Sequence, residues 1–159
     1  MCRAYHDRYG LDYVGLRYMN VYGPRQDPHG EAGVVAIFAR RLLADRTCTV
    51  FGSGRQTRDF VFVGDVADAF IRAGDSADGG LFNIGTSVET SVNELYGSMA
   101  SLAGGPMEPE REAERTGEIL RSALDPTLAG DQLNWAPTTS LESGLGQTLA
   151  WFAENAPAD

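Results

Sequence analysis

Short segments rich in β-branched and aromatic residues alternate with amphipathic segments along the whole sequence. Residues 11–18, 47–51 and 81–85 are of the first kind, and residues 34–43 and 95–103 carry apolar side chains at helical spacing. Chains that alternate in this way fold as α/β or α+β domains. The length of 159 residues fits one domain, and the sequence contains no internal repeat and no low-complexity linker.

Capping residues indicate where several helices begin and end. Residues 1–9 are expected to be helical, with Gly10 as a left-handed stop. Ser91 and Glu94 have the spacing of a capping box, which predicts a helix that continues to residue 103. Three further helix starts are expected at Asp65 as a cap of residues 66–73, at Asp125-Pro126 with proline in the first position, and at Ser140.

A glycine-containing turn at residues 52–54 predicts a β-hairpin between residues 47–51 and 57–63. A Gly-x-Gly sequence can also form a phosphate-binding loop, but this one joins two expected strands and opens no helix. The dinucleotide fingerprint and the P-loop both need a helix after the glycines. No nucleotide-cofactor loop is therefore predicted. Residues 21–33 are expected to be a long loop, and residues 108–118 an acidic segment without a pattern.

Composition argues against several classes of function. A formal charge of −9, with 13 basic and 22 acidic residues, does not fit a nucleic-acid footprint. No apolar run reaches the length of a membrane span and no signal-peptide pattern opens the sequence, so a soluble cytoplasmic protein is expected. The two cysteines, Cys2 and Cys48, are expected to be free thiols, and no metal site is predicted.

Local sequence leaves three candidate site residues open. Asn20 follows a predicted strand, where α/β sheets place ligand-binding groups, but asparagine also favours turns. Arg58 can pair with its neighbour Asp59 on a solvated face or bind an anion in a bidentate manner. Arg115 lies in an acidic stretch and is interpreted as a solvated charge. Neither histidine has a partner at catalytic spacing, so both are expected at the surface.

Five blocks of the sequence, taken together, resemble the signature blocks of one enzyme family. They are residues 16–26, 50–63, 82–86 and 115–118, and the stretch from Asp125 through Trp135 to Pro137. In this order they are similar to the NDP-sugar epimerases and dehydratases of the extended short-chain dehydrogenase family, over essentially the whole chain. The loop of residues 27–35 most resembles members that epimerise UDP-hexoses at C4. Asn134 stands where the family usually has glycine.

The resemblance implies both a fold and a binding site. Residues 1–159 would be the C-terminal, substrate-binding part of the enzyme, with the last parallel strands of a Rossmann-like sheet and a small mixed α/β subdomain. The family's sugar-nucleotide site would then comprise the diphosphate-binding Asn20, Arg58 and Arg115, the uracil-pocket helix residues Ile37 and Phe38, and the backbone of Val50 and Phe51. Tyr18 matches a position beside the nicotinamide of the cofactor.

Two parts of the family pattern are missing from this sequence. Members carry a Gly-x-x-Gly-x-x-Gly loop and a Tyr-x-x-x-Lys pair, in which the lysine charge lowers the pKa of the proton-transferring tyrosine. Neither occurs here. The resemblance therefore implies that the complete enzyme uses NAD, while this chain alone binds none, has no catalytic residue and is not competent. The N-terminal NAD-binding part would be absent, as in a fragment, a truncated gene product or one half of a split enzyme.

Three functions remain open on this resemblance. The first is the UDP-sugar-binding half of a 4-epimerase. The second is half of an NDP-sugar 4,6-dehydratase or UDP-glucuronate decarboxylase on the same scaffold. The third is a non-catalytic nucleotide-sugar-binding or assembly module. The strand at residues 11–18 would have one bare edge without the missing half, so self-association into a homo-oligomer is expected.

Overall fold

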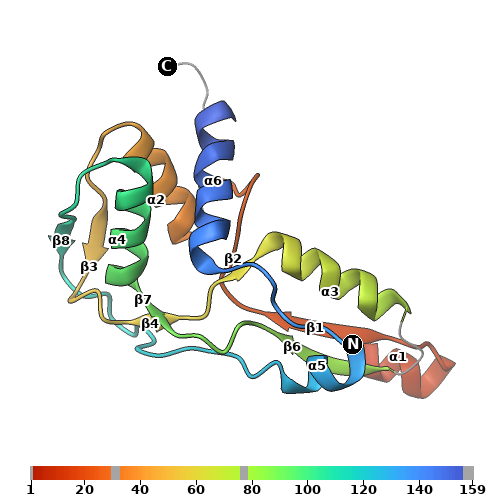
Figure 1. Ribbon diagram of the computed structural model, residues 1–159. Helices are drawn as coiled ribbons and strands as arrows, with labels where there is room; N and C mark the ends of the chain where they lie inside the picture. Colours follow the sequence, from red (N-terminus) through yellow and green to blue (C-terminus); the bar gives the residue numbers. More distant parts are fainter. Residues whose placement is uncertain (1, 30–32, 76–78, 156–159) are drawn as a thin grey trace.

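The computed structural model describes residues 2–29, 33–75 and 79–155. Figure 1 shows the arrangement of its elements. In chain order they are α1 (Cys2–Tyr9), β1 (Val14–Tyr18), β2 (Val21–Tyr22), α2 (Val34–Leu43), β3 (Thr49–Phe51), β4 (Thr57–Arg58), β5 (Val61–Phe62), α3 (Val63–Asp75), β6 (Gly80–Ile84), β7 (Thr90–Ser91), α4 (Val92–Ala103), β8 (Glu110–Glu112), α5 (Thr127–Leu133) and α6 (Leu141–Asn155).

The described strands pair in four two-stranded ladders. β1 runs parallel to β6, with Val14 opposite Gly80 and Tyr18 opposite Ile84. β2 and β5 are parallel, as are β3 and β8, whereas β4 and β7 are antiparallel. The predicted mixed α/β class with parallel strands is thereby confirmed.

The buried apolar residues form two separate clusters. α2, α4 and α6 pack together at one end, where the ring of Phe38 meets that of Tyr96 edge-on at 5.5 Å between centroids. At the other end α3 packs on β1 and α5 packs on β6, around the buried indole of Trp135 (Figure 1). α1 contributes no buried residue to either core.

The helix ends predicted from capping residues are largely confirmed. Gly10 adopts a φ of +67° and donates its N–H to His6, which ends α1. Ser91 and Glu94 form the expected capping box at the start of α4. Ser140 precedes α6 and its hydroxyl accepts the N–H of Ser143.

The predicted hairpin around residues 52–54 is wrong. Gly52 and Gly54 do have positive φ angles, but the turn leads from β3 into β4 without pairing them. β3 pairs instead with β8, more than fifty residues later, so the acidic segment at 108–118 contains a strand that its composition does not indicate. The turn is held by α4, because the carbonyl of Gly54 accepts the N–H of Asn93. Strand partners are chosen by such long-range contacts, which periodicity does not reveal.

Three other boundaries differ from expectation. Asp65 lies inside the first turn of α3, which begins two residues earlier, and its buried carboxylate accepts hydrogen bonds from Thr138 and Thr139 instead of capping its own helix. Pro126 precedes α5 as its N-cap residue and does not occupy the first helical position. The loop predicted at 21–33 begins with strand β2, and residues 30–32 of it lie outside the described part of the chain.

Candidate functional site

Pairing of β2 with β5 brings Asn20 close to Arg58. The carbonyl of Asn20 accepts the N–H of Val61 at 3.3 Å, and its side-chain amide donates to the carbonyl of Asp59 at 3.2 Å. Asp59 is the direct neighbour of Arg58, so Asn20 contacts the residue next to a candidate that is 38 positions away in the sequence. Asn20 follows the parallel strand β1, at the end where α/β sheets place ligand-binding groups, whereas Arg58 ends β4, which is antiparallel to β7.

The guanidinium of Arg58 faces the irregular segment that follows β8. It donates to the carbonyl of Ile119 at 2.6 Å and to that of Thr57 at 2.8 Å. It also lies 3.5 Å from the carboxylate of Glu118. Arg58 is therefore held in place by neighbours on the segment that carries Arg115, and does not form the ion pair with Asp59 that its sequence position allows.

Arg115 stacks on the ring of Phe51. Its guanidinium carbon lies 3.8 Å from the ring centroid, within the range of a cation–π contact. This contact joins two residues that were assigned separately to the diphosphate and to the base. Both belong to the β3–β8 region, because Phe51 ends β3 and Arg115 follows β8 by three residues.

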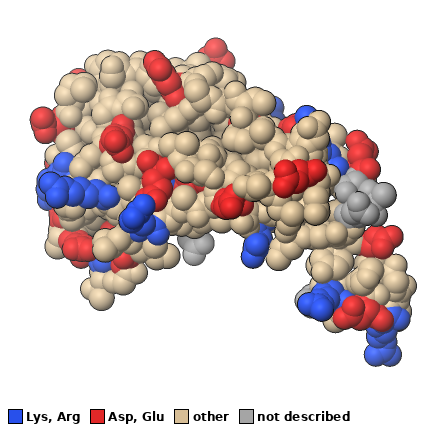
Figure 2. Space-filling view, turned by 60° about the horizontal axis from the view of Figure 1, so that its bottom comes forward, with Lys and Arg blue, Asp and Glu red and all other residues tan. Residues whose placement is uncertain are grey.

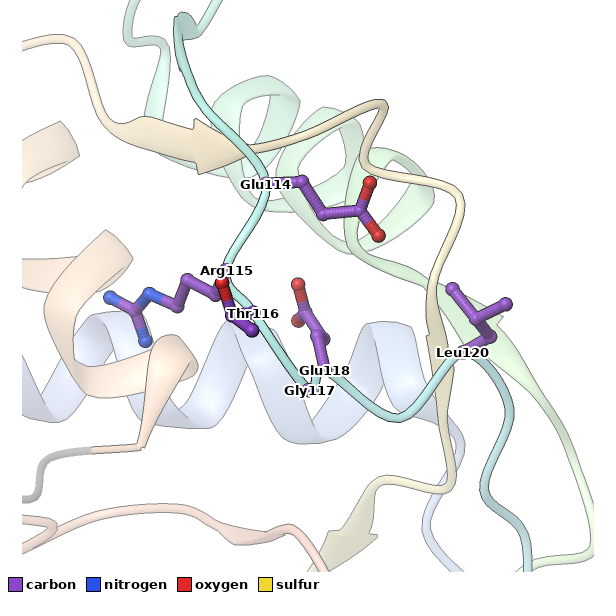
Figure 3. A pocket seen from close by; sticks show the side chains of 6 residues that line it. All are labelled: Glu114, Arg115, Thr116, Gly117, Glu118 and Leu120. Atoms are coloured by element: carbon purple, nitrogen blue, oxygen red, sulfur yellow. The ribbon is translucent and has the colours of Figure 1, made fainter.

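A pocket of about 370 Å³ opens beside Arg115. Figure 3 shows the side chains that line it, with Arg115 extending to the opposite side from Glu114 and Leu120. A second pocket of about 190 Å³ adjoins it and includes Phe51 and Gln56. Glu118 lines both pockets and accepts a hydrogen bond from the amide of Gln56 at 3.3 Å. The site is therefore an open depression with charged and apolar walls.

Among the candidate residues, Arg115 lines the first pocket and Phe51 the second, and the others line neither. Phe38 is buried in the core against Tyr96, so of the two candidates on α2 only Ile37 is exposed. Val50 is also buried, and only its backbone in β3 is available for the contact that the resemblance implies. Tyr18 is the last residue of β1, two positions before Asn20, and its half-exposed ring packs edge-on against Phe70.

Sequence reasoning missed Asp59 and Glu118 as members of the site. Asp59 was considered only as a partner of Arg58, yet its carboxylate is buried and bonded elsewhere. Glu118 was treated as part of a motif and not as a separate group. The signal for both was their adjacency to arginines in the 57–63 and 115–118 blocks.

A tight ion pair borders the site on the side of β4. Arg121 donates to both carboxylate oxygens of Glu89, at 2.6 and 3.0 Å, and the hydroxyl of Thr57 also donates to Glu89. The Arg121 hydrogen bonds and then the Thr57 hydrogen bond lower the pKa of Glu89 to about 2. Glu89 therefore stays ionised at neutral pH.

The net negative charge of the chain does not attract an anionic ligand from a distance. The chain carries a formal charge of −9, and Figure 2 shows acidic and basic side chains interspersed over one face. An anionic ligand must then be held by local donors such as Arg58 and Arg115. Along the described residues no helix is long and apolar enough to cross a membrane.

Comparison with known proteins gives consistent matches. Residues 1–85 match the model of the NAD dependent epimerase/dehydratase family. A UDP-glucose 4-epimerase of Mycolicibacterium smegmatis is 53% identical over 149 residues, covering 93% of this chain and 48% of that protein.

Two solved structures share the fold over nearly the whole chain. The UDP-glucose 4-epimerase of Thermotoga maritima with UDP-glucose has a TM-score of 0.94 at 44% identity, and covers 98% of this chain and 50% of its own. The UDP-glucose 4-epimerase of Thermus thermophilus in complex with NAD has a TM-score of 0.86 at 40% identity, with the same coverage. The chain thus spans about half the length of the relatives that it matches, and it belongs to the NAD dependent epimerase/dehydratase family.

Proposed function

We propose that this chain is the UDP-hexose-binding half of an NAD-dependent sugar 4-epimerase. The observation that carries the proposal is that Arg58 donates to the segment whose Arg115 lines an open depression. Asn20 is attached to the residue next to Arg58. Two guanidinium groups and an amide suit a diphosphate, because charge-assisted hydrogen bonds to phosphate are stronger than neutral ones. The 53% identity to a UDP-glucose 4-epimerase supports the same class of substrate.

In this proposal the diphosphate lies against Arg58 and Arg115, and the nucleoside extends toward β3 and α2. Phe51 would then border the base with its exposed edge, Val50 would contribute backbone groups, and Ile37 would supply an apolar side chain from α2. Phe38 supports this wall from the core. The sugar would extend from the diphosphate toward the part of the enzyme that carries the chemistry.

The cofactor does not fit the residues present. The sequence has no Gly-x-x-Gly-x-x-Gly loop, and its Gly52-x-Gly54 turn leads into strand β4 and not into a helix that could receive a pyrophosphate. It also contains no lysine, so no Tyr-x-x-x-Lys pair can form. NAD and the proton-transferring tyrosine would belong to a complementary N-terminal part, and this chain alone would not turn over substrate.

The surface that such a part would cover is apolar. β1 pairs only with β6 among the described strands, and Tyr18, Phe70 and Ile71 nearby are each about half or more exposed. Parallel strands are ordinarily covered on both faces. A complementary N-terminal part, which relatives of twice this length have room for, would supply the cover; a second copy of this chain is the other candidate.

Two alternative functions are also consistent with the same site geometry. A dehydratase or decarboxylase would use the same diphosphate site and differ near the catalytic residues that this chain does not contain. A non-catalytic module would bind nucleotide sugar without any partner. The identity to an epimerase favours the first proposal over the dehydratase.

Two measurements on the purified chain test the proposal. Calorimetric titration with UDP-glucose measures binding, and an NAD-dependent assay of UDP-glucose and UDP-galactose interconversion measures turnover. We expect binding without turnover, and turnover when a complementary N-terminal half is added. Binding with no turnover under any complementation would favour the module. Turnover by the isolated chain would contradict the proposal that catalysis requires the N-terminal part. Absence of UDP-glucose binding would contradict the proposed UDP-sugar site.

A further inference from the structure

Asp59 is the most heavily bonded carboxylate beside the candidate site, and it is 1% exposed. Its two oxygens accept the N–H and the hydroxyl of Thr86, the N–H of Ser87 and the N–H of Leu124, at 2.6–3.2 Å. A buried carboxylate is stable only when several donors compensate its lost hydration. Four donors from two separate chain segments provide that compensation here.

The backbone at Gly85 and Ser87 lies unusually close to the carboxylate of Asp59. A Cβ atom at Gly85 would lie 2.6 Å from the carboxylate oxygen Oδ2 and 2.9 Å from the Cβ of Leu124, so no larger residue fits. Ser87 adopts a φ of +60°, a left-handed conformation that is costly for a residue other than glycine. Its N–H points to Asp59 in this conformation. The loop is therefore held in an unfavourable shape by the carboxylate.

Asp59 is bonded to Asn20, adjoins Arg58 in the sequence and is bonded to Leu124, nine residues after Arg115. Its carbonyl accepts the side-chain amide of Asn20, and its peptide bond joins it to Arg58. Its carboxylate accepts the N–H of Leu124, near the end of the segment that carries Arg115. One residue thus links three groups that come from distant parts of the sequence.

The Arg115 segment depends on such point contacts because it has no regular structure. Residues 113–126 lie between β8 and α5 and contain neither helix nor strand. Near the middle, the carbonyl of Leu120 accepts the N–H of Thr57 at 2.9 Å and that of Ile119 accepts Arg58. At Leu124 the segment is attached a third time, because its N–H donates to the buried carboxylate of Asp59.

We propose that Asp59 is a positioning residue that sets the distance between Arg58 and Arg115 by holding the 113–124 segment and the 85–88 loop against the end of β4. The proposal rests on the proposed function for its ligand, but the positioning itself is independent of any ligand. A clamp for a dianion needs both guanidinium groups within hydrogen-bonding distance of it, because charge-assisted hydrogen bonds weaken steeply when their geometry is lost.

The test compares the wild-type chain with Asp59→Asn, which keeps the shape but places an amide NH₂ among N–H donors. Hydrogen exchange followed by mass spectrometry provides the ligand-free readout. We expect faster exchange in peptides of residues 85–88 and 113–124, with no change in α6. Unchanged exchange in both regions would overturn the proposal, and faster exchange everywhere would show a general loss of folding instead.

Titrations followed by NMR with UDP and with uridine provide the second readout. We expect Asp59→Asn to weaken UDP binding about tenfold and uridine binding by less than about twofold, because only UDP needs both arginines. Equal losses for the two ligands, or no loss, would overturn the role in the clamp. If the wild-type chain itself fails to bind UDP, the proposed function fails, while the exchange result still decides the positioning.

Thr86→Val is the milder companion variant in case Asp59→Asn does not fold. It removes one hydroxyl donor to Asp59 and leaves the backbone donors to Asp59 in place. Because the Thr86 hydroxyl also accepts the N–H of Val88, only the 113–124 peptides report on Asp59 in this variant. We expect the same direction of change in both readouts with a smaller size. Ser143→Ala, on α6 and remote from Asp59, is the matched control and should change neither readout.

Discussion

Glu118 holds Arg58 across the candidate site, with 3.5 Å between its carboxylate oxygen Oε1 and the guanidinium nitrogen Nη2 of Arg58. Both side chains are about four-fifths buried, at 20% and 18% exposure. A guanidinium has five N–H donors, more than its contacts with Glu118 and two carbonyl groups require. Arg58 can therefore receive an anion while this pair keeps its plane oriented.

Replacement of Arg58 tests the clamp directly. Arg58→Ala should weaken UDP-glucose binding by about 1.5–3 kcal/mol, the range for a hydrogen bond to a charged group. Arg58→Lys should recover only part of this, because lysine cannot form the bidentate contact. Calorimetric titration measures both variants, and Arg115→Ala should show a loss of similar size.

The control for these variants is Arg46→Ala. Arg46 is an exposed residue after α2. Its replacement by alanine removes one positive charge, as Arg58→Ala does. Arg41 is less suitable, since its guanidinium donates to the carbonyl of Thr47 at 2.6 Å and supports the chain before β3. If both Arg58→Ala and Arg115→Ala keep the wild-type affinity for UDP-glucose, the proposal that these arginines bind the diphosphate is wrong.

The isolated chain is expected to associate through the exposed edge of β1. Tyr9, Leu11 and Tyr18 are all about half or more exposed there, and an apolar strand with an unpaired edge favours pairing with another chain. Sedimentation velocity should detect dimers or larger species, and Tyr18→Lys should reduce them. A monodisperse monomer with one cooperative thermal transition would contradict this expectation.

Acid should remove the contribution of Glu89 to stability. Its pKa in the folded chain is about 2, lowered from 4.5 by the hydrogen bonds from Arg121 and Thr57. A lowered carboxyl pKa stabilises the folded state above the unfolded pKa, and this contribution disappears as the pH falls from about 4.5 to about 2. Urea unfolding of the wild type and of Glu89→Gln should differ at pH 6 and converge toward pH 2. An equal difference at both pH values would refute this assignment.

The two thiols should react at very different rates. Cys2 is exposed, whereas Cys48 is fully buried and burial raises its pKa to about 11, against a smaller opposite effect of Arg41. Little thiolate then forms at Cys48 at pH 8, and the thiolate is the reactive form. Ellman's reagent should modify one thiol quickly in the native chain and two in guanidinium chloride. Rapid reaction of Cys2→Ser would show that Cys48 is accessible.

Local features of the sequence were sufficient for most of the helices. The apolar spacing of residues 34–43 and the Ser91–Glu94 capping box act within a few residues, so α2 and the start of α4 were predictable. Strand pairing was not predictable in the same way. The partner of β3 is β8 and that of β4 is β7, and both pairings depend on which segments the helix cores bring together.

The sequence alone determined the α/β class and, through its motif blocks, pointed to Asn20, Arg58 and Arg115 as candidates. The tertiary structure alone decided how they are held. The sequence leaves open whether Asp59 pairs with Arg58, and in the structure its carboxylate accepts hydrogen bonds from Thr86, Ser87 and Leu124 instead. The physical reason is that a buried charge is stabilised by every donor that the fold delivers to it, and donors 27 to 65 residues away leave no periodic trace in the sequence.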